Sequence, residues 1–220
     1  MLLESTQERP QRRGLKMGEP EVLDSLLQRA FESVQADPMH NLALGMRREL
    51  WRSLGPELGF GQGYARRLAL ALATARHVLS LWELTYPQDR TPHTELDSAE
   101  AMRMGSLDKG EASAIWQQAW NHMVELSFSD EGSRGAAAGL SAVQALRTCI
   151  DDETFALLEV DERLRDDQVD AEDMDASMLA AAAYAGGPTW EASSDSARRL
   201  QFWEWWLSEA VLLAYQSVPG

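Results

Sequence analysis

The sequence predicts an all-α protein that folds as a single globular helical domain of about seven to nine helices. Apolar residues recur at three- and four-residue spacing along most of the 220-residue chain, as they do on the buried side of a helix. Proline and glycine interrupt this pattern at short connectors, and no segment sustains the alternation of β-branched residues typical of strands. The fractions of apolar (45%) and charged (25%) residues are those of an ordinary globular protein.

The N-terminal part predicts a leader and two helices. Residues 1–18 are polar, carry four basic side chains and show no apolar period, so we expect a disordered leader before one domain at 19–220. The first helix is expected to end at Asp37, because the residue before a proline disfavours helical geometry. The second is expected to end at Gly55-Pro56. A loop is then expected at the glycines Gly59, Gly61 and Gly63.

The clearest helical pattern leads into a proline-bracketed connection, LWELTYPQDRTP. Its apolar residues form one continuous stripe, made of Leu68, Leu72, Ala75, Leu79, Trp82 and Tyr86. Pro87 ends this helix, and Thr91 is a suitable N-cap for the next. Pro92 fits the first helical position, where its missing N–H costs nothing. These features predict a rigid helix–helix corner, with Trp82 and Tyr86 anchoring it in the core.

The second half of the chain predicts four more helices. Their expected ranges are about 108–126, 136–149, 175–185 and 194–216. Asp108 and Glu111 have the spacing of a capping box at the start of the first of them. The run Gly186-Gly187-Pro188 is a C-terminal stop for the third.

The stretch QFWEWWLSEA places three tryptophans within one turn of the last helix. Successive residues lie about 100° apart on a helix, so the three cannot all face one core. If Trp203 points inward, Trp205 and Trp206 must pack in a second contact or lie partly exposed. Burial against several neighbouring helices explains the pattern. A partner-binding face that includes Trp205 and Trp206 also explains it, because tryptophan is enriched at interface hot spots.

Most of the net charge of −15 lies in one segment. Residues 151–175, called the acidic segment below, contain twelve acids and two arginines, a net charge of −10. This balance argues against direct binding to nucleic acid or to an anionic membrane. A solvated loop accounts for the segment, and so does a negative surface that docks a basic partner protein. The docking hypothesis rests on Asp161, Glu162, Asp166, Asp167, Asp170, Glu172, Asp173 and Asp175.

The sequence contains no recognisable catalytic or metal-binding motif. The patterns GxSxG, GxxxxGK[ST] and HExxH are absent, so we expect no catalytic residues, no metal site and no cofactor. Cys149 is the only cysteine, which excludes an internal disulfide, and its helical setting predicts a buried, inert thiol. No apolar run is long enough to span a membrane, and the first residues lack the apolar core of a signal peptide. A cytoplasmic location is therefore expected.

One segment resembles a known family, the all-helical immunity protein family five of bacterial polymorphic toxin systems. It comprises residues 65–105, ARRLALALATARHVLSLWELTYPQDRTPHTELDSAEAMRMG. The matching positions are Val78, Leu79, Leu81, Trp82, Glu83, Tyr86, Pro87, Asp89, Pro92, Leu96, Ala99 and Gly105. The sequence departs from the family pattern at Ser80, where members often have proline, and at Arg90-Thr91. Neither departure removes the expected helix–corner–helix arrangement. The resemblance covers about 40 of the 220 residues.

The resemblance implies a protein that performs no catalysis and that binds and neutralises a cognate toxin. If the toxin is a nuclease, its phosphate-binding groove is basic, and the acidic segment could cover that groove. Two alternatives remain. One is a helical adaptor or scaffold that binds a basic protein unrelated to toxins. The other is a helical enzyme whose carboxylates hold a metal. The oligomeric state is not indicated by the residues.

Overall fold

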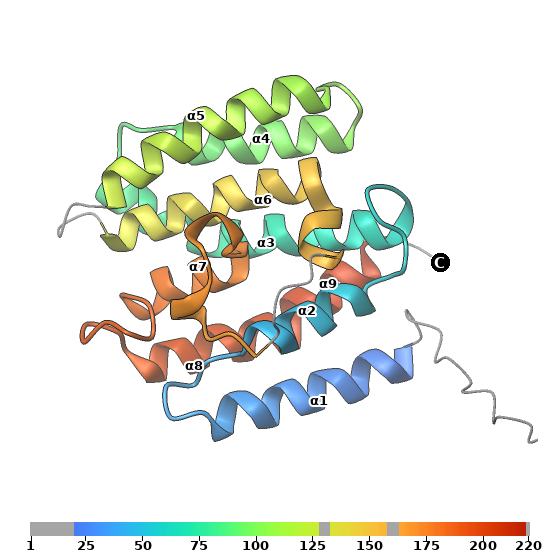
Figure 1. Ribbon diagram of the computed structural model, residues 1–220, viewed down its shortest axis with the longest axis vertical. Helices are drawn as coiled ribbons and strands as arrows, with labels where there is room; N and C mark the ends of the chain where they lie inside the picture. The colour runs from blue at the N-terminus through green and yellow to red at the C-terminus, as the bar shows by residue number, and fades with distance from the viewer. Residues whose placement is uncertain (1–19, 128–132, 158–162, 219–220) are drawn as a thin grey trace, which may run out of the picture.

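Two long helices, α3 (Gly61–Thr85) and α6 (Ser133–Leu157), form the centre of the fold (Figure 1). The structure is a computed structural model that describes residues 20–127, 133–157 and 163–218. Over these residues all regular structure is helical and no strand is present, which confirms the predicted fold class.

The other helices surround this central pair on three sides. Their bounds are α1 Pro20–Ala36, α2 Leu44–Ser53, α4 Thr91–Arg103, α5 Lys109–Ser127, α7 Ala176–Ala185, α8 Ser196–Trp205 and α9 Val211–Gln216. Helices α4 and α5 pack against α6 at one end of the molecule, and α7 packs against both central helices. Helix α9 packs on α3, while α1 contacts α2 and α8 at the opposite end (Figure 1).

Several element boundaries differ from the expected ones because tertiary contacts decide them. Gly61 and Gly63 lie in the first turn of α3 and not in a loop. A Cβ atom on Gly63 would lie 2.8 Å from the backbone carbon of Gly55, so the close approach of these two segments requires glycine. Helix α6 is also longer than expected. It continues past the alanine-rich stretch through a kink at Asp151, whose φ and ψ of −145° and 50° are not helical.

Helix α3 is buried on most of its sides because it lies at the centre. Arg66, Arg67 and Thr74 are buried together with most of the predicted apolar stripe. Two members of that stripe, Leu79 and Tyr86, are only half-buried. The sequence pattern therefore identified the helix correctly but underestimated how much of its circumference is covered.

The tryptophans of the last helix are arranged around two contacts. Trp203 and Trp206, three residues apart, are both buried and meet edge to face at 5.6 Å between ring centroids. Trp206 donates a hydrogen bond from Nε1 to Thr74 Oγ1 at 2.9 Å. Trp205 is half-buried and stacks on His77, with 3.5 Å between the two ring centroids. A π-helical turn at Trp206–Ala210 joins α8 and α9 into one continuous helix.

Gly139 allows α6 to lie directly against the side chains of α3 and α5. A Cβ atom at this position would lie 2.6 Å from Met123 Sδ and 2.8 Å from the ring of the fully buried Trp82. Contacts this short force a shift of the helix or of both side chains, because the core around them is closely packed.

Gly139→Ala is therefore expected to lower the free energy of unfolding by about 1–3 kcal/mol, even though alanine favours helices more than glycine does. Urea unfolding followed by circular dichroism measures this difference. Met123→Ala removes the sulfur atom that the new methyl group meets. This substitution should therefore lower the free energy of unfolding less in the Gly139→Ala variant than in the wild type. A stabilised Gly139→Ala variant would contradict the close contact.

Within the part of the chain that the structure describes, no helix has the length and apolar character needed to cross a membrane.

Candidate functional site

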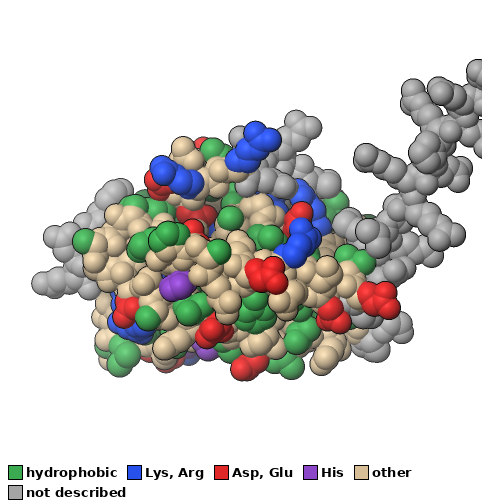
Figure 2. All heavy atoms as spheres, turned by 90° about the horizontal axis from the view of Figure 1, so that it is seen from below, with side chains coloured by type: hydrophobic (Ala, Val, Ile, Leu, Met, Phe, Trp, Pro, Cys, Tyr) green, Lys and Arg blue, Asp and Glu red, His purple; other side chains and the backbone are tan. Residues whose placement is uncertain are grey.

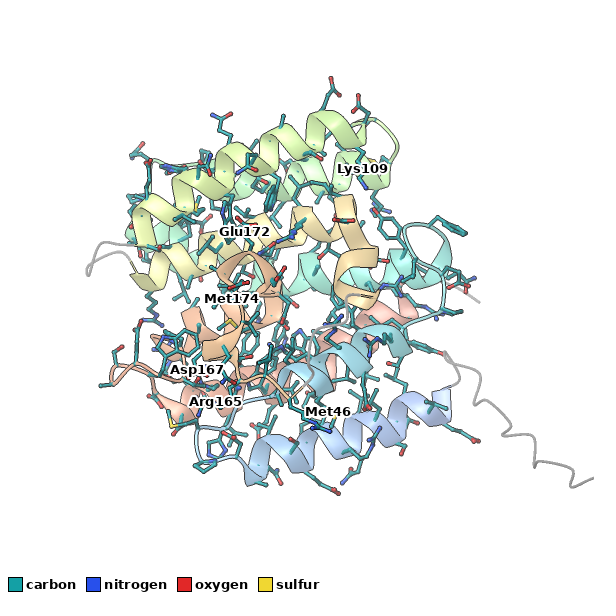
Figure 3. The ribbon with its side chains drawn as sticks, viewed as in Figure 1. Met46, Lys109, Arg165, Asp167, Glu172 and Met174 are labelled. Carbon is teal, nitrogen blue, oxygen red and sulfur yellow. The ribbon has the colours of Figure 1, made fainter. Side chains whose placement is uncertain are left out.

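The described part of the acidic segment consists of the end of α6 and of residues 163–175, which lead into α7. Its last part forms two short 3-10 turns, Asp166–Gln168 and Ala171–Asp173, before α7 begins. Figure 3 shows Arg165 and Asp167 next to each other, and Glu172 and Met174 in front of the central helices. Gln144 of α6 donates a hydrogen bond to the backbone oxygen of Glu172 at 3.0 Å, so this stretch is fixed on α6.

Two of the predicted docking acids instead hold a buried arginine of α2. Arg47, only 2% exposed, lies between Asp166 and Asp175. Its NH2 atom is 2.8 Å from Asp166 Oδ1, and its Nε atom is 2.8 Å from Asp175 Oδ2. Asn41 adds a hydrogen bond to Asp166 Oδ2 at 2.8 Å. One cation and two carboxylates therefore join α2 to the acidic segment inside the protein.

Asp175 has a second structural role at the start of α7. Its Oδ1 atom accepts hydrogen bonds from the backbone N–H groups of Ser177 and Met178, both at 3.0 Å, and so caps the helix. Burial raises the pKa of Asp175, but the charge of Arg47 and these hydrogen bonds outweigh burial, so the net pKa is lowered. Burial likewise opposes the charge of Arg47, and the two aspartates outweigh it and raise its pKa.

The first part of the acidic segment is fixed to α3 by a second buried ion pair. Asp152 and Arg67 both have fully buried side chains and form two parallel bonds, Nε to Oδ1 at 2.7 Å and NH2 to Oδ2 at 2.6 Å. Arg67 also donates to the backbone oxygen of Gly55 at 2.8 Å. A charge count along the sequence treats Asp152 as a surface acid, whereas the fold uses it as an internal counter-ion.

Four of the predicted docking acids keep part of their side chains in solvent. They are Asp167, Asp170, Glu172 and Asp173. Asp167 is paired with Arg165 at 2.9 Å and Asp173 with Arg147 at 3.9 Å, which leaves Asp170 and Glu172 as the exposed docking acids without an ion pair among the described residues. Asp161 and Glu162 lie outside the described residues. Figure 2 shows separated acidic side chains on one face of the molecule, with uncharged side chains and several basic ones among them.

Of the two tryptophans in the docking hypothesis, Trp206 is buried, with 1% of the residue exposed, and so offers almost no surface to a partner. Trp205 is half-buried, and one face of its indole is covered by His77. Trp190, which lies in the connection between α7 and α8, is the more exposed aromatic side chain, at 47%.

The residues of the family motif build the corner between α3 and α4, defined here as Tyr86–Pro92. Trp82 donates from Nε1 to the backbone oxygen of Asp89 at 2.8 Å, and its ring contacts Tyr86 at 4.5 Å between centroids. The corner is therefore closed by a hydrogen bond from the core. Glu83 Oε1 lies 3.2 Å from His93 Nε2, and this pair links α3 to α4 when the histidine is protonated.

Asp89 is the central residue of the corner. Its Oδ1 atom accepts hydrogen bonds from the backbone N–H of Thr91 at 2.8 Å and from the Thr91 hydroxyl at 2.6 Å. Its Oδ2 atom lies 2.7 Å from Nε2 of His122 on α5. Burial raises the pKa of Asp89, but these hydrogen bonds outweigh it and lower the net pKa. Thr91, expected to be the N-cap, is the first residue of α4 and depends on Asp89.

A pocket of about 690 Å³ opens between the corner, α4 and α5. Asp89, Arg90 and Thr91 line it from the corner, Glu95 from α4, and Ile115 and His122 from α5. Glu95 is 1% exposed, and its Oε2 atom has no hydrogen-bond partner among the described residues. Burial raises the pKa of Glu95 from its ordinary value of 4.5 to about 8. A second hollow, beneath the acidic segment, has a volume of only about 50 Å³.

Sequence reasoning did not identify Arg47, Arg67 or Glu95, although a signal was present for the last. Glu95 lies one helical turn before Ala99, an apolar position of the family motif, and therefore on the same side of the helix. An acid on the apolar side of a helix is rarely fully buried unless it is paired or functional. His122 of α5 lies against Asp89, and no motif in the sequence indicates this contact.

Two further expectations concern reactive and metal-binding groups. Cys149 is buried, and burial raises the pKa of its thiol to about 12, which leaves it protonated and unreactive. Over the described ranges, no group of three or more histidine, cysteine or acidic side chains is arranged to hold a metal ion.

Comparison with known proteins gives one match that covers most of the chain. The model of the family Immunity protein Imm5 matches residues 27–213, which extends the resemblance from the corner to nearly all of the described helices. A comparison with curated proteins gives no match. Because the match spans both central helices, the corner and the acidic segment, the chain belongs to the Imm5 immunity protein family.

Proposed function

We propose that this chain is a cytoplasmic, non-catalytic immunity protein that neutralises a cognate toxin by forming a stoichiometric complex with it. The family match over residues 27–213 carries the proposal, because immunity proteins act by binding a toxin partner. The arrangement of the chain is compatible with this role. Helices packed around a closely filled core present a preformed surface, and binding then costs little conformational entropy.

We further propose that the exposed acids of the acidic segment steer the toxin toward the protein. Asp170 and Glu172 are exposed, and both belong to a stretch fixed to α2 by the buried Arg47–Asp166 pair and to α6 by the Gln144 hydrogen bond. Charges held on a rigid surface raise the association rate of an oppositely charged partner and lose this effect as salt is added. The toxin surface that meets them is expected to be basic.

The test uses the toxin domain encoded beside this gene and the full chain. Asp170→Asn/Glu172→Gln is expected to lower the association rate constant about 3- to 10-fold at low salt and to leave the dissociation rate nearly unchanged. Stopped-flow fluorescence at two salt concentrations measures both effects. Glu21→Gln/Asp24→Asn removes two exposed charges from α1 and serves as the matched control, with little effect expected.

Two results would contradict the proposal at different levels. Equal association rates for both double variants would exclude steering by the acidic segment but leave neutralisation intact. No complex with the toxin at low or high salt, together with no protection of cells that express it, would exclude the immunity function itself.

A further inference from the structure

The corner pocket contains an unsatisfied buried acid, which distinguishes it from the other acidic sites of the described chain. Glu95 is 1% exposed, and its Oε2 atom is shielded from solvent without a hydrogen-bond partner. The other acids of α4 differ from it. Asp97 is exposed, and Glu100 bonds to Arg76 at 3.0 Å and to Arg103 at 2.7 Å.

Burying a carboxyl group without a partner is costly, and proteins retain such a group mainly where it has a function. The pocket around Glu95 has a volume of about 690 Å³, within the range of ligand-binding pockets. Its polar walls are fixed by the Asp89 contacts with Thr91 and His122. Glu95 therefore forms part of the wall of an open pocket, but its Oε2 atom lies behind the accessible surface, so a ligand reaches it only after neighbouring side chains shift.

The other charged groups of the pocket favour a cationic ligand. The titratable and charged side chains that line it with Glu95 are Asp89, Arg90 and His122. An anion would be repelled by the ionised Asp89, whereas a cation that displaces the Glu95 proton pairs with the carboxylate and is also attracted by Asp89, whose oxygens are bonded to Thr91 and His122. Arg90 is exposed at the mouth, where solvent screens its charge. A guanidinium group suits the site best, because it can form two parallel bonds to one carboxylate.

We propose that the corner pocket binds a guanidinium or ammonium group through Glu95, and that a basic side chain of the bound toxin supplies this group. The identification of the toxin as the source of this group rests on the proposed immunity function. The cation site itself does not. The occupant is expected to enter from the solvent side and to pair with the carboxylate inside the pocket. The corner then recognises the partner as well as connecting two helices.

Binding at this site is coupled to the loss of a proton. Because burial raises the pKa of Glu95 to about 8, its carboxyl group is mostly protonated in the free protein at neutral pH. The incoming cation favours the carboxylate, and the proton leaves to solvent. Binding of the cation is therefore expected to tighten by nearly tenfold per pH unit between pH 6 and pH 8.

The first test uses N-acetyl-arginine N-methylamide as a probe and the full chain. We expect saturable 1:1 binding, seen as NMR shifts of the corner and of α4, that is tighter at pH 8 than at pH 6. The same titration with the neutral citrulline analogue and with the aspartate analogue should show no saturation. Glu95→Gln should abolish arginine binding, while Asp97→Asn, which removes an exposed acid of the same helix outside the pocket, should preserve it.

A single side chain binds with a dissociation constant in the millimolar range at best, so the titration extends to about 20 mM arginine probe. Absence of saturation at that concentration would overturn the cation site. Preferred binding of the aspartate probe would also overturn it.

The second test compares Glu95→Gln and Asp97→Asn for binding to the toxin. A loss of affinity of at least tenfold for Glu95→Gln, with no loss for Asp97→Asn, supports docking of a toxin side chain in the pocket. Equal affinity of both variants excludes the toxin as the source of the bound cation. A protein that binds the arginine probe but no toxin would contradict the immunity function and leave the cation site standing.

Discussion

Arg47→Met is expected to lower the free energy of unfolding by about 3–5 kcal/mol, because it leaves two buried carboxylates without a counter-ion. The substitution keeps most of the side-chain volume but removes the charge that the two acids share. Asp166 and Asp175 lie 2.8 Å from the guanidinium, with side chains only 3% and 9% exposed. Neither can regain water without moving the acidic segment away from α2. Denaturant unfolding of the wild type and the variant measures the loss.

Arg165→Met is the matched control for this result. Arg165 also pairs with an aspartate of the acidic segment, at 2.9 Å from Asp167, but its side chain is 74% exposed. Exposed pairs contribute little, so a change below about 1 kcal/mol is expected. Similar losses for the two variants would contradict the internal role assigned to Arg47.

The stability of the wild type is expected to fall, relative to that of Glu95→Gln, as pH rises from about 5 to 8. The pKa of Glu95 is about 8 in the folded protein and near its ordinary 4.5 in the unfolded chain. Between these values only the unfolded chain ionises at this residue, so each pH unit favours unfolding by up to about 1.4 kcal/mol. A total relative loss of about 2–4 kcal/mol follows from this linkage.

Urea unfolding at pH 5, 6.5, 8 and 9 measures both proteins under the same conditions. Other titrating groups change both curves equally, since glutamine has nearly the same shape as glutamate and carries no charge. The difference between the curves should grow up to pH 8 and then level off. Parallel curves over this range would mean that Glu95 ionises normally in the folded protein.

The parts of the fold that depend on neighbouring residues could be predicted from the sequence. Pro87 and Pro92 bracket the corner, Asp108 caps α5 through hydrogen bonds at 2.7 and 3.0 Å, and Gly186 ends α7 with a φ of 84°. Each of these effects acts within one helical turn. The central position of α3, and the extension of α6 past Asp151, depend on contacts between distant helices, which periodicity does not specify.

The candidate sites were less predictable for the same reason. The sequence identifies twelve acids in one segment, but it does not show which of them meet an arginine. Asp166 and Asp175 reach Arg47 across 119 and 128 residues, and Asp152 reaches Arg67 across 85. The corner motif was recognised, yet its pocket depends on His122 and Ile115 of α5, which lie outside the residues that carry the resemblance.

The long reach of these ion pairs has a consequence for synthesis of the protein. Arg47 leaves the ribosome 119 and 128 residues before its two partners, a delay of roughly 6–25 s at ordinary elongation rates. During that interval the nascent chain can form individual helices, but the arginine must stay hydrated. Closure of α2 onto the acidic segment therefore waits for translation beyond Asp175, and chaperones that bind exposed helices have that time in which to act.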